Sequence, residues 1–213
     1  MKAKLIVLFL ALTAFNLPGL AQTSFRIGLT AGANDDLIHF SWMPSINKST
    51  TLWRYNAGVS FGHRLTPSLS VAYDLLYSRQ GGVDIETSVL GYGSHQTIYK
   101  VDYLSLPIMV RYHPGGRRVF MAGGPQFGYL LAAKSVDPTF SETSVWDLQY
   151  CYRLDVGLMA GLGYRLGKHL VLSSRYYYGM KPIQKPDPST GVYSDAAQKL
   201  YNRIWSSNLT YYF

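Results

Sequence analysis

The residues that could carry chemistry are few and dispersed along the chain. No two of the five histidines have the spacing of metal ligands, and they are His39, His63, His95, His113 and His169. Cys151 is the single cysteine, so no cysteine cluster can form. A lipid hydrolase would need a serine and a histidine together, but neither Ser78 nor Ser105 has a supporting spacing to His95 or His113. The sequence therefore predicts no metal site and no catalytic residue.

Two glycine-rich stretches have a superficial likeness to phosphate-binding loops. They are GGP at residues 123–125 and GLG at residues 161–163. Both lie inside expected strands and neither is followed by a helix, so we interpret the glycines as relieving crowding inside a barrel. No cofactor site is predicted.

Eight charged residues form the remaining candidate set, and their expected role is structural. Each lies on the polar face of an alternating segment; they are Arg26, Arg54, Asp74, Lys100, Asp102, Arg111, Asp155 and Arg175. Small residues beside long charged ones suit the narrow lumen of an eight-stranded barrel. Because an isolated buried ion costs on the order of several kcal/mol, we expect these residues to form an Arg/Asp network across the lumen.

The elements that would position these charges are eight segments with an apolar period of two residues, which predicts β-strands. They cover residues 25–33, 53–63, 69–78, 99–112, 119–131, 154–165, 170–180 and 203–213. In the first, Phe25, Ile27 and Leu29 share one face, opposite Arg26 and Gly28. The segment 119–131 is apolar on both faces, so its orientation is not predicted.

The fourth segment contains a change of phase. Tyr99, Val101 and Tyr103 begin its apolar face, which then shifts by one residue to the series that starts at Leu104. We interpret this shift as a β-bulge beside Pro107, where a missing N–H is tolerated.

The connections alternate in length. Short turns are expected around Thr66-Pro67, at PGG (residues 114–116) and around Gly167-Lys168, while longer polar loops are expected over residues 34–52, 79–98, 132–150 and 181–202. Short turns at one end and long loops at the other are typical of a transmembrane barrel.

The N-terminal segment is predicted to be a signal peptide, residues 1–21, with cleavage before Gln22. Lys2 and Lys4 precede an apolar run over residues 5–15, and Gly19 and Ala21 satisfy the small-residue pattern of signal peptidase. Its removal leaves 18 basic and 12 acidic residues, a net charge of +6. The mature chain, residues 22–213, is expected to form one domain without an internal disulfide.

The location of the apolar faces separates a soluble barrel from a membrane barrel. A membrane barrel turns its apolar face to lipid and its polar face to the lumen. Tyrosines cluster near the segment ends and the chain ends on Phe213, which favours aromatic girdles at the membrane interfaces. These features predict an all-β, eight-stranded, antiparallel, up-and-down transmembrane β-barrel in the outer membrane, with a lipocalin-like soluble barrel as the alternative.

Four motifs carry a family resemblance. YLSLPIMVRY at residues 103–112 and AGGPQFGYLL at residues 122–131 resemble paired motifs of the PorT-like outer-membrane β-barrel family. DVGLMAGLGY at residues 155–164 and RYYYG at residues 175–179 are similar to later strands of that family. The resemblance implies a small eight-stranded barrel of Gram-negative bacteria, in a family with one branch tied to protein secretion.

The expected function is that of a monomeric, non-enzymatic barrel with a lumen filled by side chains. Its role would be membrane integrity, surface interaction or support of a secretion assembly. Its expected partners are outer-membrane lipid, including lipopolysaccharide, and a protein bound through the external loops; nucleic acid is not expected. The alternatives are a barrel that binds a small hydrophobic ligand and a barrel-embedded lipid-modifying enzyme.

Overall fold

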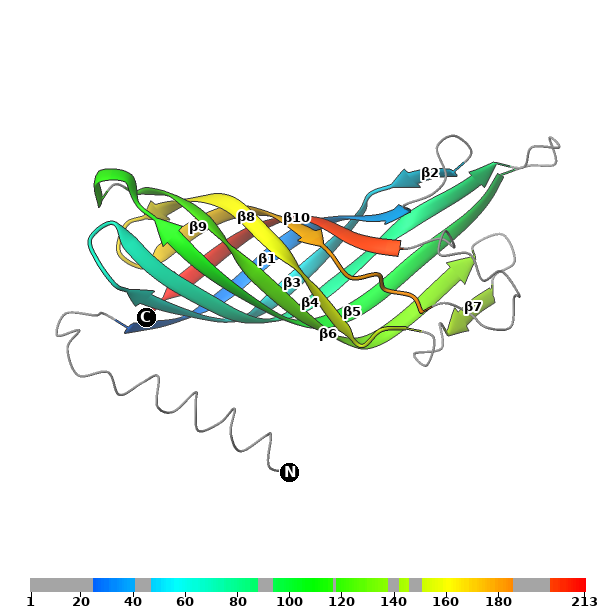
Figure 1. Cartoon of the computed structure of the whole chain (residues 1–213), viewed down its shortest axis with the longest axis horizontal. Helices are drawn as coiled ribbons and strands as arrows, with labels where there is room; N and C mark the ends of the chain where they lie inside the picture. Colours follow the sequence, from blue (N-terminus) through cyan, green and yellow to red (C-terminus); the bar gives the residue numbers. More distant parts are fainter. Residues whose placement is uncertain are drawn as a thin grey trace, which may run out of the picture.

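The chain forms a tilted barrel of antiparallel strands in a computed structural model that describes residues 25–40, 47–87, 94–116, 118–137, 142–145, 151–185 and 200–213 (Figure 1). The predicted signal peptide lies outside the described residues. The strands are β1 (Phe25–Phe40), β2 (Asn47–Thr50), β3 (Leu52–Arg64), β4 (Leu69–Thr87), β5 (Ser94–Tyr112), β6 (Val119–Asp137), β7 (Glu142–Val145), β8 (Leu154–Leu166), β9 (Leu170–Gly179) and β10 (Leu200–Tyr212).

Eight of these strands close into a ring. The hydrogen-bonded order is β3-β1-β10-β9-β8-β6-β5, and β4 completes the ring by pairing with both β5 and β3. Every pairing is antiparallel. The first described strand, β1, pairs with the last, β10, and this pairing closes the barrel. The short strands β2 and β7 add to β4 and β6 at one end. The predicted eight-stranded, antiparallel, up-and-down barrel is therefore confirmed.

Three tight connections and the C-terminus gather at one end of the barrel. We call it the periplasmic end, because short turns face the periplasm in barrels of this kind. The β5–β6 turn contains a 3-10 turn, Pro114–Gly116, in which Gly115 has φ 58°. Gly167 has φ 75° in the β8–β9 turn. A side chain rarely adopts this left-handed backbone conformation, so glycine is suited to both turns. Among the described residues, no helix has the length and apolarity needed to cross a membrane.

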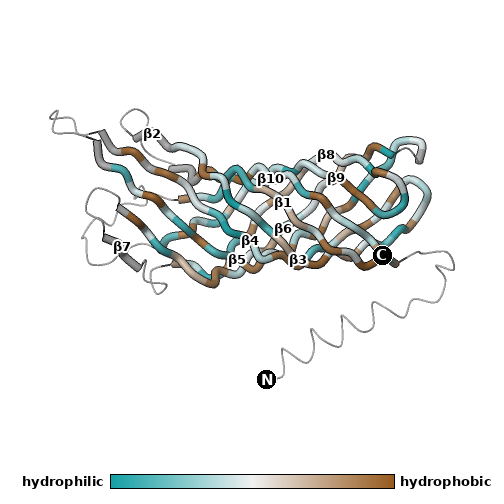
Figure 2. The backbone as a smooth tube through the Cα atoms, turned by 180° about the vertical axis from the view of Figure 1, so that it is seen from behind, coloured by the Kyte–Doolittle hydropathy of each residue, from teal (hydrophilic) through white to brown (hydrophobic). Residues whose placement is uncertain are grey.

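The outer surface of the barrel is apolar and the lumen contains most of the buried polar side chains. Trp53 is 71% exposed and points away from the lumen, while its strand neighbours Asn56 and Ser60 are buried. Figure 2 shows apolar and polar residues alternating along the strands. In β6, the predicted ambiguity is resolved: Phe127 and Tyr129 face outward, whereas Phe120 is buried inside. Lipid therefore meets the apolar side of each strand, and the lumen encloses the polar side.

The strands continue beyond the length that a membrane needs. β4, β5 and β6 have 19 residues each, whereas about 9–11 residues cross a bilayer as a tilted strand. The surplus lies at the end opposite the C-terminus (Figure 1) and comprises residues 79–87, 94–103 and 130–137, here called the outer extension. Much of the predicted long loops is therefore strand: β1 reaches Phe40 and β10 begins at Leu200.

The polarity of the barrel wall is reversed in the outer extension. Its interior holds a cluster of fully buried apolar residues, which are Val101, Tyr103, Leu130, Ala133 and Cys151. Its exterior carries the exposed side chains of Arg79, Lys100 and Lys134. This arrangement is that of a water-soluble protein, because water surrounds this part of the barrel and hydrocarbon does not.

The predicted bulge in the fourth segment is wrong. In β5, Val101, Tyr103 and Met109 all face inward, so the strand alternates without a change of phase. The apparent shift at Leu104 arises because the apolar face is the inner one in the outer extension and the outer one in the membrane. The register irregularity lies opposite, in β6, where Leu131 has no partner between the pairs Asp102–Ala132 and Tyr103–Leu130.

The lipid-facing assignment predicts a depth-dependent cost for an arginine on the outer surface. Leu209 in β10 is 48% exposed and lies four residues from each of two exposed aromatic residues on the same face, Trp205 and Phe213. Met180, one residue beyond the outer end of β9, is 60% exposed. Leu209→Arg should lower the free energy of unfolding in phospholipid vesicles by about 2–4 kcal/mol, and Met180→Arg by about 0–1 kcal/mol. Urea titrations measure both. Equal costs would show that Leu209 does not meet lipid.

The buried cluster of the outer extension predicts that the Cys151 thiol is protected. Maleimide added to the folded protein should leave Cys151 unlabelled because the side chain is fully buried. Leu130→Ala should expose it by opening a cavity in the same cluster. The neighbouring substitution Leu131→Ala, on the outer face, is the matched control and should keep Cys151 protected. Rapid labelling of the unsubstituted protein would contradict the packing described.

Candidate functional site

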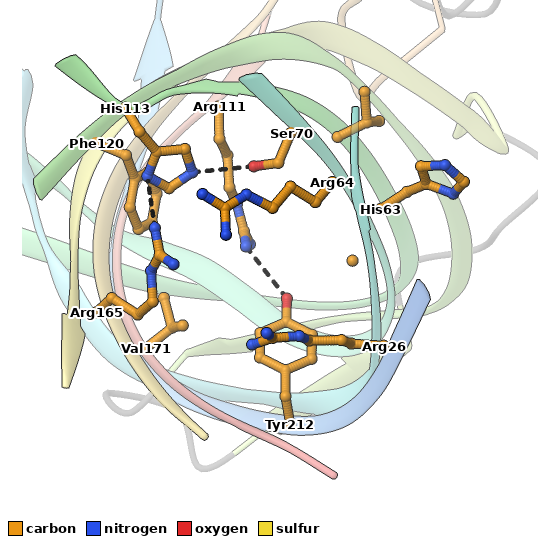
Figure 3. Close-up of a pocket in the computed structure, with 12 residues that line it drawn as sticks. Arg26, His63, Arg64, Ser70, Arg111, His113, Phe120, Arg165, Val171 and Tyr212 are labelled. Atoms are coloured by element: carbon orange, nitrogen blue, oxygen red, sulfur yellow. Dashed lines mark hydrogen bonds between the residues drawn. The ribbon is translucent and has the colours of Figure 1, made fainter. Parts of the chain in front are cut away.

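A pocket opens at the periplasmic end of the lumen, and Figure 3 shows the side chains that line it. Four arginines from four strands line the pocket, together with His113, and no acidic side chain is present among the lining residues. The full lining is Arg26, Gly62, His63, Arg64, Ser70, Val71, Arg111, His113, Phe120, Arg165, Val171 and Tyr212. The pocket is therefore strongly basic, with Phe120 and Val171 on its apolar wall.

Strand register brings these residues together from distant parts of the sequence. Arg64 ends β3, Arg111 lies one residue before the end of β5, and Arg165 lies one residue before the end of β8. Arg26 follows the first residue of β1, and its Nη1 donates to the Lys168 carbonyl at 3.0 Å. Because up-and-down topology alternates strand direction, the starts and ends of adjacent strands meet at the same mouth.

A chain of hydrogen bonds connects the pocket to a buried ion pair. Arg175 Nη1 donates to Asp74 Oδ2 at 2.6 Å, and Ser60 Oγ donates to Asp74 Oδ1 at 2.5 Å. The Tyr212 hydroxyl oxygen lies 2.9 Å from Ser60 Oγ, and Arg111 Nη1 donates to that hydroxyl at 3.2 Å. Since Ser60 uses its single proton on Asp74, the Tyr212 hydroxyl must donate to Ser60. Arg175 and Ser60 thus donate to the Asp74 carboxylate directly. Arg111 and Tyr212 are connected to the same carboxylate through Ser60.

A serine–histidine pair lies at the same mouth, but its proton is on the wrong nitrogen for catalysis. Ser70 Oγ is 3.0 Å from His113 Nε2, and Arg165 Nη2 is 3.2 Å from His113 Nδ1. Arginine can only donate, so Nδ1 accepts and Nε2 carries the proton. A general base would need an unprotonated Nε2 facing the serine. The contact with Arg165 therefore keeps His113 from activating Ser70.

Nearer the outer end, amides and hydroxyls fill the lumen. Asn56 Nδ2 donates to Asn34 Oδ1 at 2.6 Å, and Asn34 Nδ2 donates to Ser78 Oγ at 3.1 Å. Gln80 Nε2 also donates to Ser78 Oγ, at 3.1 Å. These side chains cross-link β1, β3 and β4 inside the barrel.

The predicted charge network is divided between several places. Asp74, Arg111 and Arg175 share the hydrogen-bonded chain described above, while Arg26 lies at the mouth. Asp155 is buried near the outer end and accepts from Asn202 Nδ2 at 2.7 Å. Arg54 pairs in register with Asn34, also toward the outer end.

Lys100 and Asp102 are corrections to that predicted network, because both lie on the outside of the barrel. Lys100 is exposed, and Asp102 forms a 3.6 Å ion pair with Arg79 and accepts from the Tyr77 hydroxyl at 2.9 Å. The error has the same cause as the predicted bulge: both residues belong to the outer extension, where the polar face is the outer face.

Several residues of the site were not among the predicted set. Arg64 and Arg165 lie at the ends of β3 and β8. Tyr212 belongs to the aromatic C-terminus, yet it faces inward and is 4% exposed. Tyr212 lies on the polar face of the last segment, opposite Tyr211 and Phe213, and this position in the sequence could have indicated that its side chain enters the lumen. No group of metal-ligating side chains occurs within the described ranges.

The buried ion pair predicts a large cost for removing its cation. Arg175→Met should lower the free energy of unfolding by about 3–5 kcal/mol, because Asp74 would remain buried without a counter-charge. Adding Asp74→Asn to that variant should restore part of the loss. Arg79→Met, which breaks the exposed Arg79–Asp102 pair, should cost about 0–1 kcal/mol. Urea unfolding in vesicles compares the three, and similar losses for Arg175→Met and Arg79→Met would refute the assignment.

The barrel is similar to several solved outer-membrane proteins. Neisserial surface protein A is 14% identical, with 90% of this chain and 99% of that chain covered and a TM-score of 0.50. Ail of Yersinia pestis, in a structure with the heparin analogue sucrose octasulfate, is 15% identical, with 89% and 99% covered and a TM-score of 0.47. OprG from Pseudomonas aeruginosa is 15% identical, with 90% and 95% covered and a TM-score of 0.41.

At 14% identity, the similarity to Neisserial surface protein A extends to the fold alone. No curated protein sequence matches the chain. A family model described as an outer membrane protein beta-barrel domain matches residues 20–185, more than half of the chain. A closed barrel with an apolar outer wall and this family match together place the protein in the outer membrane, and the chain belongs to the family of outer membrane protein β-barrel domains.

Proposed function

We propose that the protein is a non-enzymatic surface protein: its barrel anchors it in the outer membrane, and its outer extension presents a rigid platform to a partner outside the cell. The observation that carries this proposal is the length and reversed polarity of the outer extension. Nineteen-residue strands with a packed apolar interior and charged exterior are unnecessary for anchoring alone.

Packing inside the lumen supports an anchoring role over a channel role. The Asp74–Arg175 pair and the Asn34–Asn56 pair are both buried in the lumen. A buried apolar cluster also packs inside the barrel, and it contains Met109, Met159, Tyr177 and Ile204. Eight strands leave an interior that side chains can fill, whereas aqueous channels belong to larger barrels.

Aromatic and basic side chains on the outer wall support binding to lipopolysaccharide. The Arg203 guanidinium lies 3.6 Å from the ring centre of Tyr178, and the Arg79 guanidinium lies 5.3 Å from the ring centre of Tyr55. Tyrosine rings favour the membrane interface, and the cations beside them would face the phosphates of the outer leaflet. We propose that these pairs form the outer aromatic girdle and hold lipopolysaccharide around the barrel.

The other candidate functions lack an observation of comparable weight. Support of a secretion assembly, as the PorT-like resemblance implies, would place the partner at the periplasmic turns. A small hydrophobic ligand would need an apolar cavity, whereas the pocket is lined by arginines. A lipid-modifying hydrolase is disfavoured because the His113 tautomer leaves Ser70 without a base.

The filled lumen predicts an absence of channel activity. The purified protein in planar lipid bilayers should give no stable conductance steps, because ions find no continuous aqueous path through the packed side chains. A general porin prepared in the same detergent is the positive control. Large, regular steps from the present barrel would contradict the anchoring role.

Site-specific crosslinking in intact cells tests the platform itself. A photoreactive amino acid replaces Lys134, exposed on the outer extension, or Lys168, exposed in a periplasmic turn. Crosslinks from position 134 to lipopolysaccharide or to an extracellular partner are expected, with few from position 168. Protein crosslinks from position 168 alone would overturn the proposal in favour of a periplasmic assembly.

A further inference from the structure

The periplasmic mouth contains more positive charge than the described residues neutralise. Five guanidinium groups gather there or just above it, those of Arg26, Arg64, Arg111, Arg165 and Arg175, against the single side-chain carboxylate of Asp74. Asp74 is already paired with Arg175 at 2.6 Å. The four arginines of the pocket have no side-chain carboxylate of the described residues within ion-pair distance. Arg111 is buried and the other three are partly exposed, so the repulsion between their like charges is strongest around Arg111.

Arg111 is the most constrained of the four. It is 6% exposed, and its guanidinium stacks over Phe120 at 5.1 Å while Nη1 donates to the Tyr212 hydroxyl. Its Nη2 is buried and has no hydrogen-bond partner. A buried charged donor without a partner costs more than an ordinary unmade hydrogen bond. The side chain is thus held with one strong donor uncommitted, in a residue that lines the pocket.

The three arginines around Arg111 are also oriented by neutral acceptors. Arg64 donates to the carbonyls of Thr66 and Pro67 at 3.3 and 3.0 Å, and Arg165 donates to His113 Nδ1. Arg26 donates to the Lys168 carbonyl. These bonds fix the guanidinium planes but remove none of their charge. Figure 3 shows the arginine side chains pointing into the same space at the mouth.

We infer that this mouth is a binding site for a phosphate group from the periplasm, either free or as a phosphate monoester. A guanidinium group presents paired N–H donors that match two oxygens of a phosphate. Because a phosphate carries about two negative charges and several acceptor oxygens, it can bind more than one guanidinium group. A carboxylate carries one charge and two oxygens, and it satisfies fewer of these donors. The site rests on the lumen geometry and is independent of the proposed surface function.

Titration with inorganic phosphate tests the site. Calorimetry on the purified, folded barrel in non-ionic detergent should give one phosphate per chain, and Arg111→Met should weaken the affinity by about tenfold or more. Glycerol phosphate distinguishes a monoester from the free ion, and acetate tests a carboxylate. Arg79→Met is the matched control, because it removes an exposed guanidinium from the opposite end of the barrel and should leave phosphate affinity unchanged.

A second variant keeps the test decisive if Arg111→Met does not fold. Arg165→Gln alters a partly buried pocket arginine that lies outside the Asp74 hydrogen-bond chain, and it should also weaken phosphate binding. Absence of binding at about 10 mM phosphate, which would nearly saturate a site with a Kd of about 1 mM, would overturn the inference. So would equal binding of acetate, or an equal loss of phosphate affinity in Arg79→Met.

Discussion

Closure of the sheet is the constraint on which the rest of this structure depends. In hydrocarbon no water is present to satisfy a free N–H or C=O group, so all the strands must find partners on both sides. The pairing of β1 with β10 meets this demand, because it joins the first described strand to the last. Once the ring is closed with eight strands, each residue faces either lipid or a narrow lumen, and its chemistry must suit the side that it faces.

The narrow lumen explains why glycine and large aromatic residues occur together inside the barrel. A side chain at Gly163 would collide with the ring of Phe120, and one at Gly157 would lie 2.7 Å from the ring of Tyr177. The same lack of room forces charged groups into contact. Asp74 collects the hydrogen bonds of Arg175 and Ser60, and through Tyr212 it also orients Arg111. Structural pairing at this level leaves the basic mouth below it available to an anion.

The change of surroundings along the barrel axis explains its two different interiors. Within the membrane the interior holds the ion pair and most of the buried polar side chains beside smaller apolar clusters, because most apolar side chains face lipid. In the outer extension, water lies outside and the interior becomes apolar, with Val101 and Leu130 at its centre. One continuous strand, β5, passes through both regions without a bulge. We propose that function is accordingly divided between an anchoring segment, an outer platform and a basic periplasmic mouth.

The sequence by itself determined the strand count, the short turns at Gly115 and Gly167, and the lipid face of the membrane segment, because these follow from a local period of two and from local turn chemistry. It also placed Asp74, Arg111 and Arg175 on the lumen face. Tertiary structure alone decided the rest. Lys100 and Asp102 face outward because the strands outlast the bilayer, and Arg64, Arg165 and Tyr212 meet at one mouth because antiparallel closure brings distant strand ends together. Alternation reports which residues share a face, but the solvent on that face depends on where the closed barrel sits in the membrane.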